Sequence, residues 1–206
     1  MVSSTLLQTA IEQFGRLGFE GASTRDIARA SGTAMSSITY HFGGKEGLYL
    51  AAADHIAESI SAMQAPVLKA VQERPDESRK AAVEGLLAII DSMAQMMLRP
   101  ESEDWARFII REQQAPTEAF ERLYDGVMKN VLAVVAGLMA RVRPDYDDRT
   151  LRAAAILLVG QAMMLRAGRA AVCRALGAET IDEPLATLLR AQLRAHALCI
   201  LSEKPQ

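Results

Sequence analysis

Apolar residues recur at helical spacing along most of this 206-residue chain. Leu6, Ala10, Phe14 and Leu17 would line one face of a first helix, and Gly18 is suited to the left-handed cap that ends it. No stretch shows the sustained alternation of apolar and polar residues that is typical of a half-buried strand. Aromatic residues are only 5% of the chain, whereas residues that lose little rotamer freedom in a helical turn dominate. The sequence therefore predicts an all-α fold.

Glycine and proline divide this pattern into helices. Ser23 with Asp26 three positions later predicts a capping box at a helix start, and Gly32 ends that helix. A short helix is expected from Met35 to Phe42. Prolines are expected at the boundaries of the later helices, namely Pro66, Pro75, Pro100, Pro116, Pro144 and Pro184. These helices are expected over 45–64, 67–73, 77–98, 102–114, 117–142, 147–174 and 183–202.

The charge, cysteine and histidine content bears on nucleic-acid binding, on disulfides and on metal sites. The formal net charge is -2, and residues 1–50 carry as many acidic as basic side chains, so affinity for nucleic acid would have to come from a local surface. Cys173 and Cys199 lie far apart and fit neither a disulfide framework nor a zinc site, which indicates a reducing cytoplasm. The three histidines show no metal spacing, so we expect no metal and no cofactor.

The longest apolar run, from Ala153 to Leu165, bears on membrane association. Gly160 and Gln161 interrupt it, and its length falls short of the roughly 20 residues that a bilayer span requires. We therefore expect a buried helix there and no membrane partner.

The segment between Phe14 and Phe42 predicts a helix-turn-helix. Ala28 supplies the small residue needed where the two helices meet, and Gly32 supplies a turn that tolerates positive φ. In the following helix, Ile38 and Phe42 would face inward. The side chains left to approach a DNA groove and backbone are then Ser36, Ser37, Thr39 and Tyr40.

These residues resemble the DNA-binding domain of TetR-family regulators. The resemblance is carried by Gln8-Thr9-Ala10, Phe14, Gly18-Phe19, Ser23 to Ala28, Gly32 and the run from Tyr40 to Leu48. It implies a helix-turn-helix DNA-binding domain over residues 1–50 and a larger helical ligand-sensing and dimerisation domain over 51–206. Two positions depart from the family pattern: Ala34 replaces the usual Ser or Thr cap, and Thr39 stands where a Tyr is usual, with Tyr40 beside it.

A second stretch, from Trp105 to Phe120, resembles the CecR-type subgroup of this family. That resemblance implies control of drug-export genes. The function expected is therefore a DNA-binding transcriptional repressor released by a small amphipathic ligand, and not an enzyme. Its expected partners are double-stranded operator DNA, the small-molecule effector and a second copy of the chain.

Three of the predicted DNA contacts have a plainer interpretation beside them: Arg25 would otherwise be a solvated surface charge, and His41 would be a packed or surface side chain. Thr24 would grip a phosphate at a helix start, or would help Ser23 to cap the helix. Lys45 stands at a helix start, where the positive end of the macrodipole disfavours a cation. This cost favours a phosphate partner for the ammonium group, as the resemblance also implies. The DNA-binding residues predicted are Thr24, Arg25, Ser36, Ser37, Thr39, Tyr40, His41 and Lys45.

Methionines that share helices with other apolar residues suggest a ligand pocket, because flexible thioethers accept varied apolar ligands. Plain core packing is the alternative interpretation. Arg111 or Arg166 would be the polar anchor, or would form an exposed ion pair. The ligand-binding residues predicted are Met93, Met97, Phe108, Arg111, Tyr124, Met128, Met163 and Arg166.

The last two long helices, 147–174 and 183–202, have wide apolar faces that favour close helix packing. The resemblance implies that they form the four-helix interface of a dimer. Two other classes stay open: a helical small-molecule-binding protein without specific DNA binding, and an enzyme. For an enzyme we find no Gly-rich phosphate loop, no nucleophile elbow and no paired acid and base, so no catalytic residue is nominated.

Overall fold

The computed structural model describes residues 4–74 and 76–202, and the secondary structure within these ranges is helical, without strands. This confirms the all-α expectation. The contacts among residues divide the chain into two compact units, which we describe separately. The first unit contains Met1–Ser61 with Glu101–Met128, and the second contains Ala62–Pro100 with Lys129–Gln206.

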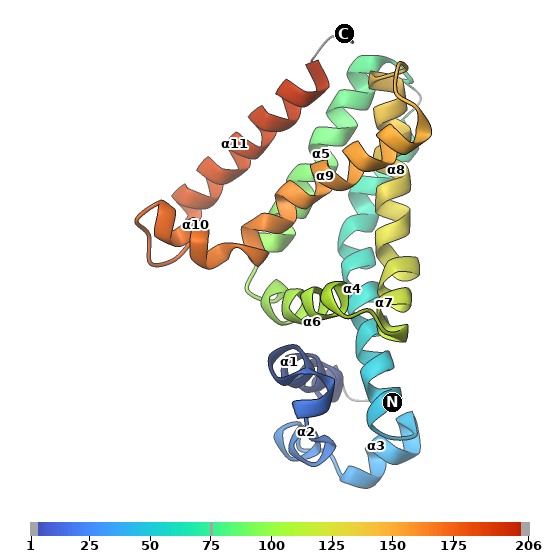
Figure 1. Ribbon diagram of the computed structural model, residues 1–206, viewed down its shortest axis with the longest axis vertical. Helices are drawn as coiled ribbons and strands as arrows, with labels where there is room; N and C mark the ends of the chain where they lie inside the picture. The colour runs from blue at the N-terminus through green and yellow to red at the C-terminus, as the bar shows by residue number, and fades with distance from the viewer. Residues whose placement is uncertain (1–3, 75, 203–206) are drawn as a thin grey trace. The chain divides into compact units, whose positions relative to one another are not determined.

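The first unit combines the N-terminal helices with a segment from the middle of the chain (Figure 1). Its core is built from Phe14, Ile27, Ile38, Leu48 and Phe108, all of which are fully buried. Its helices are α1 (Ser4–Gly21), α2 (Thr24–Ala30), α3 (Met35–Phe42), the first part of α4 (Lys45–Gln72), α6 (Ser102–Gln114), α7 (Glu118–Leu123) and the single-turn π-helix η1 (Tyr124–Met128).

Short-range signals in the sequence are visible in this unit. Gly18 has φ 77 and interrupts α1 at the expected place. Ser23 caps α2 by accepting a hydrogen bond from the Asp26 amide at 3.4 Å. In a capping box the Asp26 carboxylate would accept a hydrogen bond from the amide of the cap residue, Ser23. In the structure this carboxylate makes an ion pair with Arg29 at 2.6 Å.

The second unit is a helical layer around α5 (Arg79–Leu98), which packs against α8 (Lys129–Val142), α9 (Asp148–Ala167) and α11 (Glu183–Ser202). The short helix α10 (Arg169–Ala175) joins α9 to α11 (Figure 1). Leu86, Ile89 and Ile90 of α5 are buried at the centre of these contacts. The unit therefore depends on an α5 that is apolar on several sides.

Three helix boundaries differ from the sequence-based expectation. Pro66 lies inside α4, which continues to Gln72 and does not end at residue 64. Proline cannot donate the helical hydrogen bond, and the burial of Leu68 and Val71 in the following turns offsets this loss. The helix expected over 117–142 contains a π-helical turn, and the one expected over 147–174 ends at Ala167, before Gly168. Pro75 lies outside the described residues.

By length and composition alone, three segments are apolar enough to cross a membrane: Arg79–Leu98, Glu118–Val142 and Asp148–Ala167. The apolar run from Ala153 to Leu165 alone is too short to cross a membrane, but a longer stretch of Asp148–Ala167 that includes Arg152 and Arg166 is apolar enough on average. Within Arg79–Leu98, 61% of the most apolar 18-residue stretch is buried inside the protein. The corresponding share is 33% in each of the other two segments. The apolar character of α5 is therefore largely accounted for by the core, and that of α9 is not.

Candidate functional site

Helices α2 and α3 meet in the geometry that a helix-turn-helix requires. Ala28 is buried at 3% exposure, so α3 approaches α2 with no larger side chain between them. Gly32 has φ 66, and the amide of the next residue, Thr33, donates to the Ala28 carbonyl at 2.9 Å. Both the small residue and the positive φ were predicted from the sequence, and both are confirmed.

The outer face of α3 is open to solvent. Ile38 is fully buried and Phe42 is half-buried, so they anchor the helix to the rest of the first unit. On the opposite side Ser36, Thr39, Tyr40 and His41 are exposed, and Ser37 is half-buried. Tyr40 is 85% exposed, an unusual state for a large aromatic side chain in a monomer. The face therefore offers hydroxyl groups and an aromatic ring to a partner.

The junction between α3 and α4 is held by glycines. Gly43 has φ 74, and its amide donates to the Thr39 carbonyl at 2.9 Å to close the end of α3. A Cβ on Gly47 would lie 1.8 Å from the Phe42 carbonyl oxygen. The first turn of α4 can therefore lie directly against the last residue of α3 only because position 47 has no side chain.

The predicted phosphate contacts lie at two helix starts. Thr24 is the first residue of α2 and is half-buried, whereas Arg25 is exposed. The Lys45 ammonium donates to the Glu20 carbonyl at 3.3 Å and lies 4.7 Å from the centre of the Phe19 ring. Lys45 thus has an intramolecular role that the sequence argument did not foresee, and its phosphate contact stays a prediction.

Comparisons with known families decide which class of protein this is. Residues 6–52 match the family of bacterial regulatory proteins called the tetR family. Residues 82–203 match the C-terminal domain of the HTH-type transcriptional dual regulator CecR, and this match covers more than half of the chain. The chain belongs to the TetR family and is of the CecR type. As a TetR-family regulator it is a DNA-binding transcription regulator, a class that does not consist of enzymes.

Individual relatives agree with this membership. The HTH-type transcriptional dual regulator CecR of Shigella flexneri is 29% identical over 95% of this chain and 89% of its own length. The HTH-type transcriptional regulatory protein RaaS of Mycobacterium tuberculosis is 33% identical over 69% of this chain and 60% of its own length.

Solved structures of TetR-family regulators share the fold. A structure of AibR in complex with isovaleryl coenzyme A and operator DNA has a TM-score of 0.69 and 16% identity, and it covers 93% of this chain and 95% of that one. A structure of FadR from Bacillus subtilis in complex with stearoyl-CoA has a TM-score of 0.65 and 16% identity, with 98% of each chain covered.

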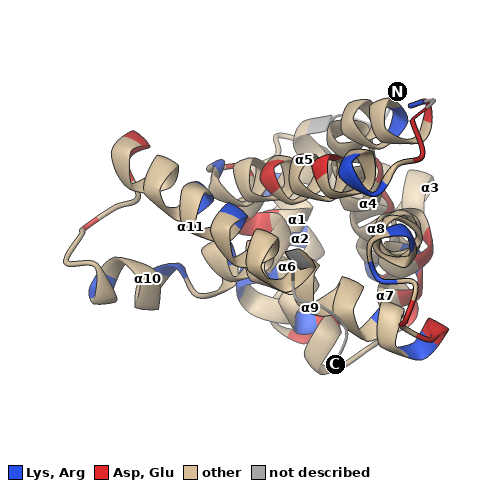
Figure 2. Cartoon of the chain, turned by 90° about the horizontal axis from the view of Figure 1, so that it is seen from above, with Lys and Arg blue, Asp and Glu red and all other residues tan. Residues whose placement is uncertain are grey.

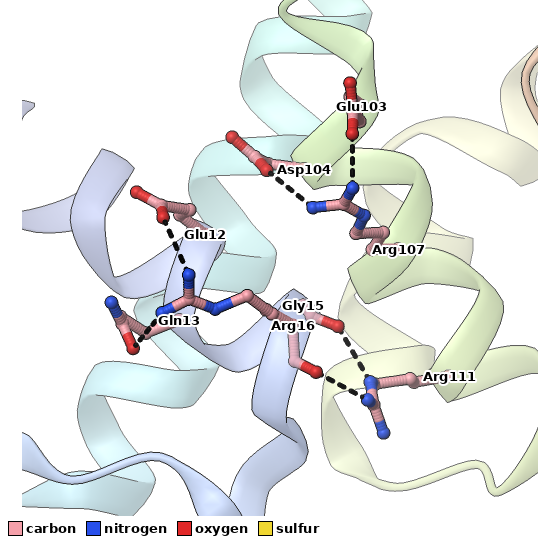
Figure 3. A network of polar contacts seen from close by, with 8 residues as sticks. All are labelled: Glu12, Gln13, Gly15, Arg16, Glu103, Asp104, Arg107 and Arg111. Carbon is pink, nitrogen blue, oxygen red and sulfur yellow. Dashed lines mark hydrogen bonds and ion pairs between the residues drawn. The ribbon is translucent and has the colours of Figure 1, made fainter.

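Helix α6 packs along α1 within the first unit, and polar contacts connect the two helices (Figure 3). The Arg111 guanidinium donates to the main-chain carbonyls of Gly15 at 2.8 Å and Arg16 at 2.9 Å. Arg107 makes ion pairs with Glu103 and Asp104 on its own helix. Burial, and secondly the Glu12 carboxylate of α1, raise the pKa of Asp104.

The eight residues predicted to bind a ligand are divided between the two units. Phe108, Arg111, Tyr124 and Met128 are in the first unit, and Met93, Met97, Met163 and Arg166 are in the second. Met93 and Met97 are buried, as core packing would also require.

The two arginines proposed as ligand anchors bind main-chain oxygens. Arg111 donates to the carbonyls of α1 described above, and Arg166 donates to the carbonyls of Met97, at 2.9 Å, and Arg99. These carbonyls lie at an interruption or an end of a helix, where the helix itself provides no partner. Both guanidinium groups thus have main-chain partners that the sequence did not indicate, and their contact with a ligand stays a prediction.

Buried amides are polar candidates that the sequence argument missed. Gln64 is 1% exposed, and its side-chain oxygen has no hydrogen-bond partner among the described residues. The buried side-chain oxygen of Gln161 is likewise without one in residues 4–74 and 76–202. Because an unsatisfied buried acceptor is costly, such groups suit a ligand that donates a hydrogen bond. The available signal was an uncharged polar residue that interrupts an apolar run, as Gln161 does.

A groove of about 500 Å³ lies between α5 and α11 in the second unit. Its walls include Leu87 and Ile90 with the ion pair of Asp91 and Arg190. None of the eight predicted ligand residues lines this groove.

Proposed function

We propose that this TetR-family regulator is a homodimeric repressor that binds a near-palindromic operator through α3 and is released by a small amphipathic effector. The observation that carries this proposal is the solvent-facing side of α3, with Tyr40 85% exposed over a fully buried Ile38. Side chains of a recognition helix that read base edges must project in this way. The DNA-binding residues proposed remain those that the sequence predicted.

A mobility-shift experiment with the DNA upstream of the protein's own gene tests this proposal. Tyr40→Ala and Ser37→Ala should change which sequences are preferred, because a good base contact is worth about 1–3 kcal/mol of discrimination. Thr180→Ala, at an exposed position between α10 and α11 in the second unit, is the control and should bind like the unaltered protein. If the protein binds all DNA equally, specific operator recognition is ruled out.

A second copy of the chain is the partner that the apolar surface of α9 and α11 suits. Ile156 is 56% exposed, Leu157 is 71% exposed and Leu188 is 49% exposed. Residues 153–165 of α9 contain no charged side chain. The acidic and basic residues of the chain are coloured in Figure 2. A two-fold dimer places two recognition helices for two operator half-sites, which is why we expect a near-palindrome.

The effector is proposed to be an amphipathic molecule that enters the methionine-rich part of the second unit. AibR and Bacillus subtilis FadR were solved with acyl-CoA ligands, which are amphipathic thioesters. Met93, Met97 and Met163 would contact the apolar part, and the side-chain oxygen of Gln64 would accept a hydrogen bond from the polar part. A screen of acyl-CoAs and amphipathic drugs for operator release tests this, with Gln64→Leu and Met97→Ala as variants; an unchanged response in both would place the effector elsewhere.

We also propose a domain boundary near residue 50. The compact unit that contains the N-terminal helices extends beyond this boundary to Ser61 and includes α6 and α7. We further propose that the protein acts in the cytoplasm, without a membrane, and controls drug-export genes. The departures at Ala34 and Thr39, with the neutral charge of the first 50 residues, favour one alternative. It is a helical small-molecule-binding protein without specific DNA binding, and the mobility-shift experiment separates the two.

A further inference from the structure

Glu112 is a buried carboxylate at the end of α6, with 2% exposure. Its Oε1 accepts a hydrogen bond from the Tyr49 hydroxyl at 2.6 Å. Its Oε2 accepts from the Thr117 amide at 3.1 Å and from the Thr117 hydroxyl at 2.9 Å. A buried charge is stable only with such donors, so the carboxylate holds the start of α7 and the side chain of Tyr49 together.

Tyr49 connects this carboxylate to the DNA-binding helices. Its ring packs edge-on against the rings of Phe14 and Phe19, with ring centres 4.8 Å and 5.1 Å apart. It also stacks on the Phe108 ring, with ring centres 4.6 Å apart. Burial and the bond to Glu112 raise the pKa of the Tyr49 hydroxyl, so the hydroxyl stays protonated and donates at neutral pH.

Two residues before Tyr49, Gly47 lies against the last carbonyl of the recognition helix. The space for a Cβ at Gly47 is filled by the Phe42 oxygen, as described above. A shift of the first turns of α4 would therefore move the end of α3. The chain of contacts runs from Thr117 through Glu112 and Tyr49 to α3, and all of it lies in the first unit.

We propose that Glu112 is a positioning residue for DNA recognition, because it holds α4, and hence α3, in the orientation that reads an operator. Residues 101–128 are thus a working part of the DNA-binding unit, although they lie far from it in sequence. This inference rests on the operator binding proposed above. Arg111 supports the same arrangement by holding the α1 carbonyls next to it (Figure 3).

Three variants of the full-length protein test the inference. Tyr49→Phe removes one hydroxyl and keeps the ring packing. Glu112→Leu removes the acceptor for all three donors. Glu112→Gln is the conservative variant, because its oxygen can accept from Thr117 while its amide donates to the Tyr49 oxygen. Tyr146→Phe in the second unit is the matched control for the loss of a tyrosine hydroxyl.

The quantity measured is the ratio of affinity for the operator to affinity for unrelated DNA, at a temperature where circular dichroism shows each variant to be folded. We expect Tyr49→Phe to lower this ratio about fivefold and Glu112→Leu by more, at the lower end of the roughly 5–150-fold range of couplings between sites. Glu112→Gln should retain most of the ratio. A residue that only stabilises the fold would lower the unfolding temperature and leave the ratio unchanged.

The possible outcomes separate this inference from the proposed function. If the unaltered protein shows no preference for the operator, the proposed function fails, and the positioning role fails with it. If the unaltered protein is specific but Tyr49→Phe matches Tyr146→Phe in ratio, only the positioning role is overturned. Should Glu112→Leu not fold, Tyr49→Phe and Thr117→Val decide the matter, since each removes only part of the bonding.

Discussion

The main-chain oxygen of Phe42 occupies the space in which Gly47 would carry a Cβ, at a distance of 1.8 Å. This close approach is to the main chain and not to the end of a flexible side chain, so a Cβ at position 47 could not be accommodated without moving the backbone. Together with Gly43 at φ 74, this contact determines how the recognition helix α3 leads into α4. The glycines of this junction are therefore part of the DNA-binding architecture.

Gly47→Ala should destabilise the protein, because the new methyl group forces the α3–α4 junction apart; overpacking of this kind costs about 1–3 kcal/mol. Urea unfolding measures the change. Gly137→Ala is the matched control, since a Cβ at that α8 position meets nothing within 4 Å. It should stabilise the helix by about 0.5–1 kcal/mol. Midpoints that move in the same direction for both variants would contradict this account.

Lys45→Ala should weaken binding to all DNA sequences alike. If the ammonium leaves the Glu20 carbonyl for a phosphate, the slope of log affinity against log salt should become shallower by about 0.9. A salt titration of operator binding gives the slope, with Lys80→Ala on α5 of the second unit as control. An unchanged slope would leave Lys45 with only its intramolecular contacts to Glu20 and Phe19.

Leu157→Asp should convert the proposed dimer to monomers. The side chain is 71% exposed in one protomer, so its replacement costs little until a second copy covers it. Light scattering after size exclusion reports the mass. Leu17→Asp on α1, where the side chain is 45% exposed, is the control and should leave the dimer intact. Leu193 is unsuitable for this purpose, since it is only 7% exposed and its replacement would damage the core of one protomer. A dimer that persists in Leu157→Asp would place the interface elsewhere.

The ion pair between Asp91 and Arg190 should make stability depend on acid. Arg190 donates to both carboxylate oxygens at 2.7 Å, which lowers the pKa of Asp91 below its ordinary value. A carboxyl group with a lowered pKa stabilises the folded state above its unfolded pKa of about 3.9 and loses this contribution as the pH falls through its folded value.

Asp91→Asn should accordingly lower the free energy of unfolding at pH 7, by less than about 1 kcal/mol because the pair is partly solvated. The difference from the unaltered protein should shrink below pH of about 4. Denaturant unfolding over a range of pH tests this. Asp148→Asn, whose carboxylate is 78% exposed beside Arg152, should show a smaller effect. A difference that grows in acid would refute the role of the pair.

Much of the local structure follows from short-range rules. Helices over Met35–Phe42, Ser102–Gln114 and Glu183–Ser202 were predicted at the positions where the structure has them. The breaks at Gly18 and Gly32 and the Ser23 cap were predicted as well. Each of these features depends on neighbours within about one helical turn, so periodicity, caps and glycine carry the necessary information. The exposed face of α3 follows from the same periodicity.

The roles of the charged and polar side chains were decided only in three dimensions. Tyr49 and Glu112 are 63 positions apart, and Arg111 is 96 positions from the Gly15 carbonyl that it binds. No local pattern marks such partners, since a guanidinium beside an apolar run reads equally well as a ligand anchor, an ion pair or a clamp on a helix. Pro66 was misread for the same reason, because buried contacts of Leu68 and Val71 outweigh a local rule. The sequence by itself determined where helices begin and turn, through interactions within one turn of chain, whereas long-range packing decided which helices a buried carboxylate or an arginine holds together.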